Sequence, residues 1–266
     1  MNIFCEELKY YRRSTIIWVV VLCSLVVMFL SIYSSFAVDV ESAKTLLAAY
    51  PPAVLAALNL KIDIFFTIYG FFGYLLTFLW LTGAIQAMNL GVSVLSKEIS
   101  GKTADFLMSK PVTRFRILTE KLTAAFILIV ITNIFYLSFA ILAAKTFSRD
   151  GLDMWLFLMI AFTFFFIQIF FLAFGFLLAA VVPKIKTVVA FTLPFIFTFF
   201  IISAFGGAIN LKEVDYITPF KYFDISYIYH NHAYDPKYLW ILTGFVIVCV
   251  ATSYVVFMKK DIQAAS

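Results

Sequence analysis

Six long runs of residues without a charged side chain or a histidine constrain this chain more than any other feature. They cover residues 16–38, 64–90, 122–144, 155–182, 188–209 and 239–258. About 20 apolar residues in an α-helix are enough to cross the hydrocarbon core of a bilayer. With 64% hydrophobic and 13% charged residues, the chain has too few polar side chains to cover a water-soluble globule. The sequence therefore predicts an all-α polytopic membrane protein, a single transmembrane domain over residues 1–266 with six transmembrane helices.

The basic residues predict the orientation of these spans. The first run follows Glu6 and Glu7 and is longer than the apolar core of a signal peptide, so we expect it to be a retained span. Six spans place both termini on one side, and that side carries 13 of the 20 Lys and Arg residues. Because cytoplasmic loops are enriched in Lys and Arg, we expect a multi-pass protein of the cell membrane with both termini in the cytoplasm.

Three segments outside the spans differ in character. Residues 1–15 place Phe4, Leu8 and Tyr11 on one face, which predicts an amphipathic helix at the membrane interface. Residues 91–121 form a basic cytoplasmic loop. Residues 210–238 form an outer segment rich in Tyr and Phe, in which Pro219 and Pro236 exclude one long helix.

The spans offer no site that could bind a driving ion. Asp, Glu, Lys, Arg or His inside the membrane would indicate such a site, and the six runs contain none. If the chain moves a substrate against a gradient, we therefore expect the energy to come from another subunit. The amide side chains in the spans either hydrogen-bond between helices or line a substrate path: Gln86, Asn89, Asn133 and Gln168. The small residues Gly83, Ala87 and Gly91 form a stripe that could pack helices within or between subunits.

Motifs for nucleotide binding and catalysis fail on inspection. Gly101-Lys102-Thr103 matches the end of a phosphate-binding loop, but Ser96 stands where that motif requires its first Gly. We therefore expect no ATP hydrolysis and no cofactor on this chain, and no catalytic residue is assigned.

A metal site in the outer segment is the weaker interpretation of its two histidines. His230 and His232 would face the same way in a strand, with Asp224 and Asp235 nearby, but a solvated loop is the better interpretation. We expect no metal site, and the three cysteines show neither a disulfide framework nor a zinc spacing.

The cytoplasmic loop carries a pattern of helix signals. The second span can continue as a helix to residue 99, with Gly101 just past its end. Thr103 can cap a short helix over residues 104–109, which Pro111 ends. Thr113 can cap a further helix that begins at Arg114 and runs through the third span. A short helix between two long ones forms a rigid lever, although an ordinary basic loop would have the same composition.

The same residues resemble a known family signature. The run from Glu98 through Gly101, Thr103, Leu107 and Pro111 to Arg114, followed by Glu120 and Lys121, is similar to the motif of type 2 ABC transporter permeases. The sequence departs from that motif in three places: the acidic residue stands one position closer to the Gly, Lys102 is inserted, and Glu120 replaces a small residue.

The resemblance implies a half-transporter of the type V exporter kind. In that family an interfacial helix precedes six spans, a coupling helix docks on a separate ATP-binding subunit that holds ATP and Mg²⁺, and two permeases form the pathway. The implied ATPase contacts are Lys97, Glu98, Gly101, Lys102, Thr103, Phe106, Leu107, Lys110, Pro111 and Arg114. The implied re-entrant outer segment includes Gly206, Gly207, Pro219, Phe220, Tyr222 and Phe223.

The leading hypothesis is therefore the permease subunit of an ATP-driven ABC exporter, with an amphipathic or hydrophobic substrate such as a peptide, an antibiotic or a lipid. Its expected partners are an ABC ATP-binding subunit, a second permease copy or paralogue and the lipid bilayer. The small net charge of +5 gives no reason to expect nucleic acid. The alternatives are a stand-alone membrane interaction or immunity protein, and a membrane-embedded lipid-modifying enzyme that acts through His230 and His232.

Overall fold

The computed structural model describes residues 3–36, 44–47, 49–58, 60–100, 113–148, 151–182, 184–209 and 212–259. All regular structure within these ranges is helical. Six helices are long and apolar enough to cross a membrane: α1 (Ile3–Phe36), α5 (Ile68–Ser100), α7 (Arg114–Phe147), α8 (Met154–Val181), α9 (Val188–Ile209) and α11 (Pro236–Lys259). The predicted all-α polytopic membrane fold with six spans is confirmed.

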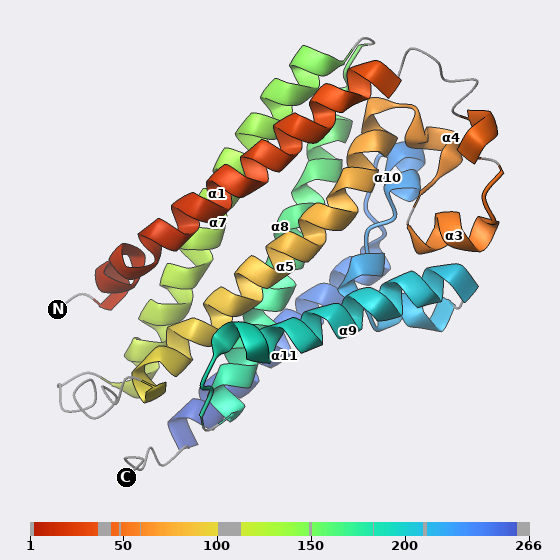
Figure 1. Cartoon of the computed structure of the whole chain (residues 1–266). Coiled ribbons are helices and arrows are strands. Elements are labelled where there is room, and N and C mark those ends of the chain that lie inside the picture. Colours follow the sequence, from red (N-terminus) through yellow and green to blue (C-terminus); the bar gives the residue numbers. More distant parts are fainter. Residues whose placement is uncertain are drawn as a thin grey trace.

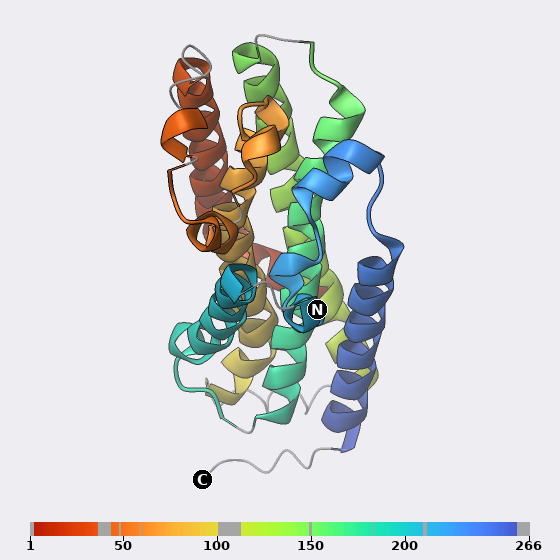
Figure 2. The same ribbon diagram turned by 90° about the vertical axis from the view of Figure 1, so that its right-hand side faces the viewer.

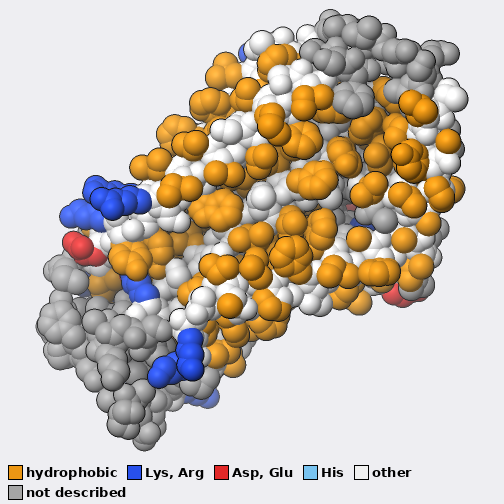
Figure 3. Space-filling model, in the orientation of Figure 1, with side chains coloured by type: hydrophobic (Ala, Val, Ile, Leu, Met, Phe, Trp, Pro, Cys, Tyr) orange, Lys and Arg blue, Asp and Glu red, His pale blue; other side chains and the backbone are white. Residues whose placement is uncertain are grey.

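Short helices lie in the segments that connect the spans, some of them at one end of the bundle (Figure 1). These are α3 (Pro52–Ala57), α4 (Ile62–Phe65), α10 (Ile225–Asn231) and the single-turn 3₁₀ helices η1 (Lys212–Tyr216) and η2 (Pro219–Lys221). We call the end where α4 and α10 lie the loop end, and the end where α1 begins and α11 ends the terminal end. Figure 3 shows that most Lys and Arg side chains on the face of Figure 1 gather toward the terminal end, while the band between the two ends is largely hydrophobic.

The pair α5 and α8 forms the centre of the bundle. These two helices have the largest buried shares of the six spans, whereas α9 and α11 have the smallest. The small residues predicted as a packing stripe make this pair possible. A Cβ on Gly91 would lie 2.5 Å from the Leu172 carbonyl oxygen, and one on Gly175 would lie 2.6 Å from the Met88 carbonyl oxygen. The stripe therefore packs α5 against α8 within one chain.

The first helix is longer than its span requires. The sequence pattern indicated a separate interfacial helix over residues 1–15, whereas residues 3–36 form one continuous α-helix, about 51 Å long at 1.5 Å per residue. It packs along α7. Its first four turns are thus a rigid extension of the first span, and Tyr11, on the predicted apolar face, is buried against protein.

The start of the second span also differs from the sequence prediction. The second span was expected to begin at residue 64, but residues 62–65 form the separate helix α4 and α5 begins at Ile68. The Thr67 hydroxyl donates to the Ile64 carbonyl oxygen (2.7 Å) and accepts from the Gly70 amide (3.1 Å), which stabilises the turn between the two helices. In contrast, α9 coincides with the predicted residues 188–209, and α5 continues past the span as expected.

Candidate functional site

A buried ion cluster ties three helices together at the terminal end. Its members are Glu7 on α1, Lys97 on α5 and Lys121 on α7. The Lys121 ammonium donates to the Glu7 carboxylate (2.6 Å) and to the Val94 carbonyl oxygen (2.8 Å), and Lys97 donates to the second oxygen of the same carboxylate. Glu7 is 3% exposed and Lys121 0%. A carboxylate and an ammonium this deeply buried are tolerable only as a hydrogen-bonded pair.

Aromatic contacts complete the cluster. The Lys97 ammonium lies 4.2 Å from the centre of the Tyr10 ring and 5.1 Å from that of Tyr11. The Tyr11 hydroxyl in turn accepts a hydrogen bond from Ser93 (2.7 Å). The start of α1 is therefore fixed to the last turns of α5, immediately before residues 101–112.

The helix that follows those residues is fixed from a different direction. The Thr113 side chain caps α7 by accepting from the Arg116 amide (3.3 Å), as the sequence predicts. The Arg114 guanidinium donates to the Met258 carbonyl oxygen (3.4 Å), and the hydroxyls of Thr119 and Tyr254 lie 2.8 Å apart. The start of α7 thus packs on the end of α11, so both flanks of the expected coupling segment are anchored.

Only the flanks of the expected ATPase contact can be placed. Lys97 and Arg114 both bond within the chain, and Glu98 is in the last turn of α5, with its side chain outside the described residues. The remaining expected contacts lie outside the described residues: Gly101, Lys102, Thr103, Phe106, Leu107, Lys110 and Pro111. Contact of these residues with an ATPase stays a prediction.

Three of the four predicted amide side chains form one network inside the bundle. Gln168 on α8 donates to Gln86 on α5 (2.9 Å) and accepts from Asn133 on α7 (2.6 Å), while Gln86 donates to Thr132 (3.0 Å). None of these four side chains belongs to a residue more than 5% exposed. The network links α5, α7 and α8, which is the interhelical alternative weighed from the sequence.

The fourth amide, Asn89, links different helices. It accepts a hydrogen bond from Thr192, and so connects α5 to α9. Within the described residues, the side-chain amide oxygen of Asn133 and the hydroxyl of Thr77 are buried without a hydrogen-bond partner. That any of the four amides lines a substrate path stays a prediction.

The segment between α9 and α11 runs along α8 from the middle of that helix toward the loop end (Figure 2). The Phe220 ring lies 5.4 Å from that of Phe171, about 26 Å along α8 from its first residue. Farther along the chain, the Tyr234 hydroxyl donates to the Met159 carbonyl oxygen (2.7 Å), much closer to the start of α8. The segment therefore begins deep in the bundle, as a dipping segment requires. That it re-enters a bilayer stays a prediction.

The residues expected in this dipping segment are packed closely. Pro219, Phe220, Tyr222 and Phe223 are buried, and the Phe223 ring stacks on that of Phe166 at 5.3 Å. Gly206 packs against the Val214 side chain, where a Cβ would approach to 2.4 Å.

A cavity of about 730 Å³ opens between the segments that connect the spans at the loop end. We call it the loop-end cavity. The described residues that line it come from α3, α4, the last turn of α9, η1, η2, α10 and the start of α11, and from the loops between them. The Lys221 ammonium lies over Gly207, 2.9 Å from where a Cβ would stand. Burial lowers the pKa of Lys221, and the charge of Asp215 partly opposes that shift.

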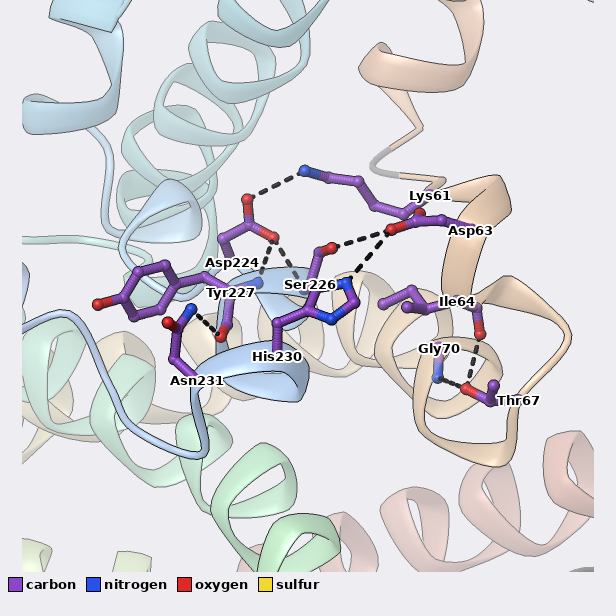
Figure 4. A network of polar contacts seen from close by, with 10 residues as sticks. All are labelled: Lys61, Asp63, Ile64, Thr67, Gly70, Asp224, Ser226, Tyr227, His230 and Asn231. Atoms are coloured by element: carbon purple, nitrogen blue, oxygen red, sulfur yellow. Dashed lines mark hydrogen bonds and ion pairs between the residues drawn. The ribbon is translucent and has the colours of Figure 1, made fainter.

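A polar network links the two sides of this cavity (Figure 4). The Lys61 ammonium lies 3.0 Å from the Asp224 carboxylate, which also caps α10 by accepting from the Ser226 amide (2.9 Å). The Ser226 hydroxyl donates to Asp63 (3.2 Å), and His230 lies 3.8 Å from the same carboxylate. These contacts connect α10 to the segment just before α5.

The two histidines lie near different carboxylates, His230 near Asp63 and His232 near Asp153. His230 lies in α10, and His232, at φ 50°, ends that helix 3.9 Å from Asp153. Asp235 accepts from the Lys237 amide (3.0 Å) at the start of α11. Within the described part of the chain, no group of three or more His, Cys, Asp or Glu residues could hold a metal.

Sequence reasoning missed the ion cluster, although one signal was available. Glu7 lies three residues after Phe4 and four before Tyr11, on the apolar face of the helix. A carboxylate on such a face requires a buried partner. Lys121 as that partner could not be inferred, because 114 residues separate it from Glu7.

Comparison with known proteins identifies the family. A family model described as ABC-2 family transporter protein matches residues 1–262, nearly the entire chain. No curated protein matches the chain. This match over nearly the whole chain agrees with the six apolar spans, and it shows that the chain belongs to the ABC-2 family of ABC transporter permeases, the membrane components of such transporters.

Proposed function

We propose that this permease is the membrane subunit of an ATP-driven exporter that works as a dimer with a separate ATP-binding subunit. The observation that carries the proposal is the family match over residues 1–262 on a chain whose only Gly-Lys-Thr lacks the rest of a phosphate-binding loop. ATP and Mg²⁺ then bind to the partner subunit. The substrate is amphipathic or hydrophobic, in the class of peptides, antibiotics or lipids.

The proposed docking element is the loop between α5 and α7. Its flanks support this role, because α5 is fixed to α1 by the buried ion cluster and α7 is fixed to α11 by Arg114 and Thr119. Movement of residues 101–112 would then be transmitted to α5 and α7, because both helices are fixed to the bundle where they meet this loop. The excess of Lys and Arg at the terminal end supports a cytoplasmic location of this end in the cell membrane.

The test is co-purification with an ATPase. The chain is expressed together with the genes that neighbour its own, and the complex is isolated through a tag on the permease. We expect the ATPase to co-purify with the wild type and with Phe106→Leu, which keeps an apolar side chain, but not with Phe106→Asp. Absence of any ATPase from the wild-type complex overturns the proposal, and equal recovery with Phe106→Asp overturns the docking role of this segment.

A transport assay separates the exporter from the stand-alone alternative. Vesicles containing the complex should accumulate a fluorescent amphiphile only when ATP is supplied, and a Walker-B variant of the ATPase should abolish that accumulation. Full activity of the permease in cells that lack the ATPase would instead establish an interaction or immunity protein.

A further inference from the structure

The charges around the loop-end cavity are unequal. Among the described residues that line it, four are acidic (Asp63, Asp215, Asp224, Asp235) and two are basic (Lys61, Lys221). With all of them ionised, the lining carries a net charge of −2. Burial lowers the pKa of Lys221, and loss of its proton would make the net charge of the lining more negative. The field inside the cavity therefore attracts a cation and repels an anion.

The uncharged part of the lining is aromatic and aliphatic. Among the described residues, its aromatic side chains are Phe220, Tyr222, Phe223, Tyr227, Tyr234 and Tyr238. The rings of Tyr222 and Tyr238 stack at 5.4 Å. Burial raises the pKa of both Tyr222 and Tyr234 to about 12, so these phenols stay neutral near neutral pH. Neutral aromatic faces attract cations through their quadrupoles, and they also bind apolar surface.

The carboxylates already have hydrogen-bond donors. Asp224 pairs with Lys61 and caps α10, Asp63 accepts from Ser226, and Asp235 accepts from a backbone amide. A ligand with strong donors of its own, such as a primary ammonium, would have to give up water without replacing it fully. A cation whose charge is delocalised or shielded by carbon needs no such bonds and responds only to the field and the rings.

We propose that the loop-end cavity binds a lipophilic cation, a molecule with one shielded or delocalised positive charge on an apolar, mainly aromatic body. The volume of the cavity, about 730 Å³, is within the range of roughly 300–1,000 Å³ that is usual for small-molecule sites. That such a cation is also the exported cargo rests on the proposed function, whereas its binding does not.

The test uses two probes of matching shape and opposite charge, tetraphenylphosphonium and tetraphenylborate. Binding of each is measured by equilibrium dialysis against the purified full chain in nanodiscs, without ATPase or nucleotide, and the signal of empty nanodiscs is subtracted. We expect saturable binding of the phosphonium and none of the borate. Saturable binding of both probes, or of neither, overturns the proposal.

Variants at the lining separate the charge effect from general hydrophobic binding. Asp63→Asn with Asp235→Asn keeps the size of both side chains and should weaken phosphonium binding by about three- to tenfold, because two attractive charges are lost. Lys221→Gln removes a repulsive charge and should strengthen binding by a similar factor. Asp153→Asn is the matched control, since Asp153 is acidic and at the same end but is not part of the lining.

The opposite signs of the two changes make the result independent of a folding defect, because misfolding can only weaken binding. Equal affinity of Lys221→Gln and wild type, or an equal loss in the Asp153→Asn control, overturns the proposal. The proposed function is tested separately by recovery of the ATPase, which the lining variants should leave unchanged.

Discussion

Replacing Glu7 by Gln should destabilise the protein far more than an ordinary change of charge. The Glu7 carboxylate is the common acceptor for Lys97 and Lys121, and the Lys121 side chain is only 1% exposed. Glu7→Gln removes the negative charge while keeping the size of the side chain, which leaves the Lys121 ammonium buried and uncompensated. Removal of one partner from a buried ion pair costs about 3–5 kcal/mol. Because Gln keeps one acceptor oxygen, we expect about 3 kcal/mol.

The neighbouring residue provides the control. Glu6 lies 3.8 Å from Lys9 in an exposed pair, with side chains 56% and 70% exposed. Surface pairs of this kind contribute about 0–1 kcal/mol, so Glu6→Gln should change the stability little. The free energy of unfolding is measured by titrating detergent-solubilised protein with SDS and following tryptophan fluorescence.

The outcome that contradicts this reasoning is equal stability of the two variants. A double-mutant cycle adds a second check. The cycle uses Glu7→Leu, Lys121→Met and the variant with both changes. Each single change should be destabilising, and the double variant should cost about 2 kcal/mol less than the sum of these two single changes. Strict additivity would show that the pair is not coupled.

Two further predictions concern the centre of the bundle. Gly175→Ala should destabilise the protein by about 1–3 kcal/mol because its methyl group would overlap the facing carbonyl of α5, whereas Gly244→Ala, where no atom lies within 4 Å, should be neutral or slightly stabilising; thermal unfolding compares the two. Gln168→Leu should cost about 1–2 kcal/mol by leaving two buried amides without their partner, whereas Ser138→Ala, which loses a hydrogen bond only to its own helix, should cost less than about 0.5 kcal/mol in the same assay.

The spans were predictable because the bilayer imposes a simple requirement. Each backbone polar group in the hydrocarbon core must be satisfied within the chain, so a run without charges can only be a helix. For this reason the span predicted over residues 188–209 has the same bounds as the helix α9 in the structure. The cap at Thr113 was equally predictable, because a single side chain and the next three residues determine it.

Boundaries that depend on local turns were less predictable. Hydropathy does not separate α4 from α5, because Ile64, Phe65 and Phe66 are as apolar as the span that follows them. The break depends on the Thr67 hydroxyl, which bonds to both helices. The same limitation applies to the start of α1, where an amphipathic pattern fits an interfacial helix as well as a helix packed on protein.

The loop-end cavity could not be read from the sequence. Its lining comes from the segment between α1 and α5 and from the segment between α9 and α11, which are more than 140 residues apart in the chain. Gly206 and Gly207, which the family resemblance placed in a re-entrant outer segment, do line the cavity, whereas re-entry itself stays a prediction. Sequence reasoning assigned no role to Lys61, Asp63 or Lys221, because their meaning depends on which charges they face.

The ion cluster also has a consequence for biosynthesis. Glu7 is made before both of its partners, because Lys97 and Lys121 follow it by 90 and 114 residues. At elongation rates of about 5–20 residues per second, synthesis reaches Lys121 roughly 6–23 s after Glu7. The ion pair between α1 and α7 cannot form before then, so docking of this part of α1 has to follow synthesis of the start of α7.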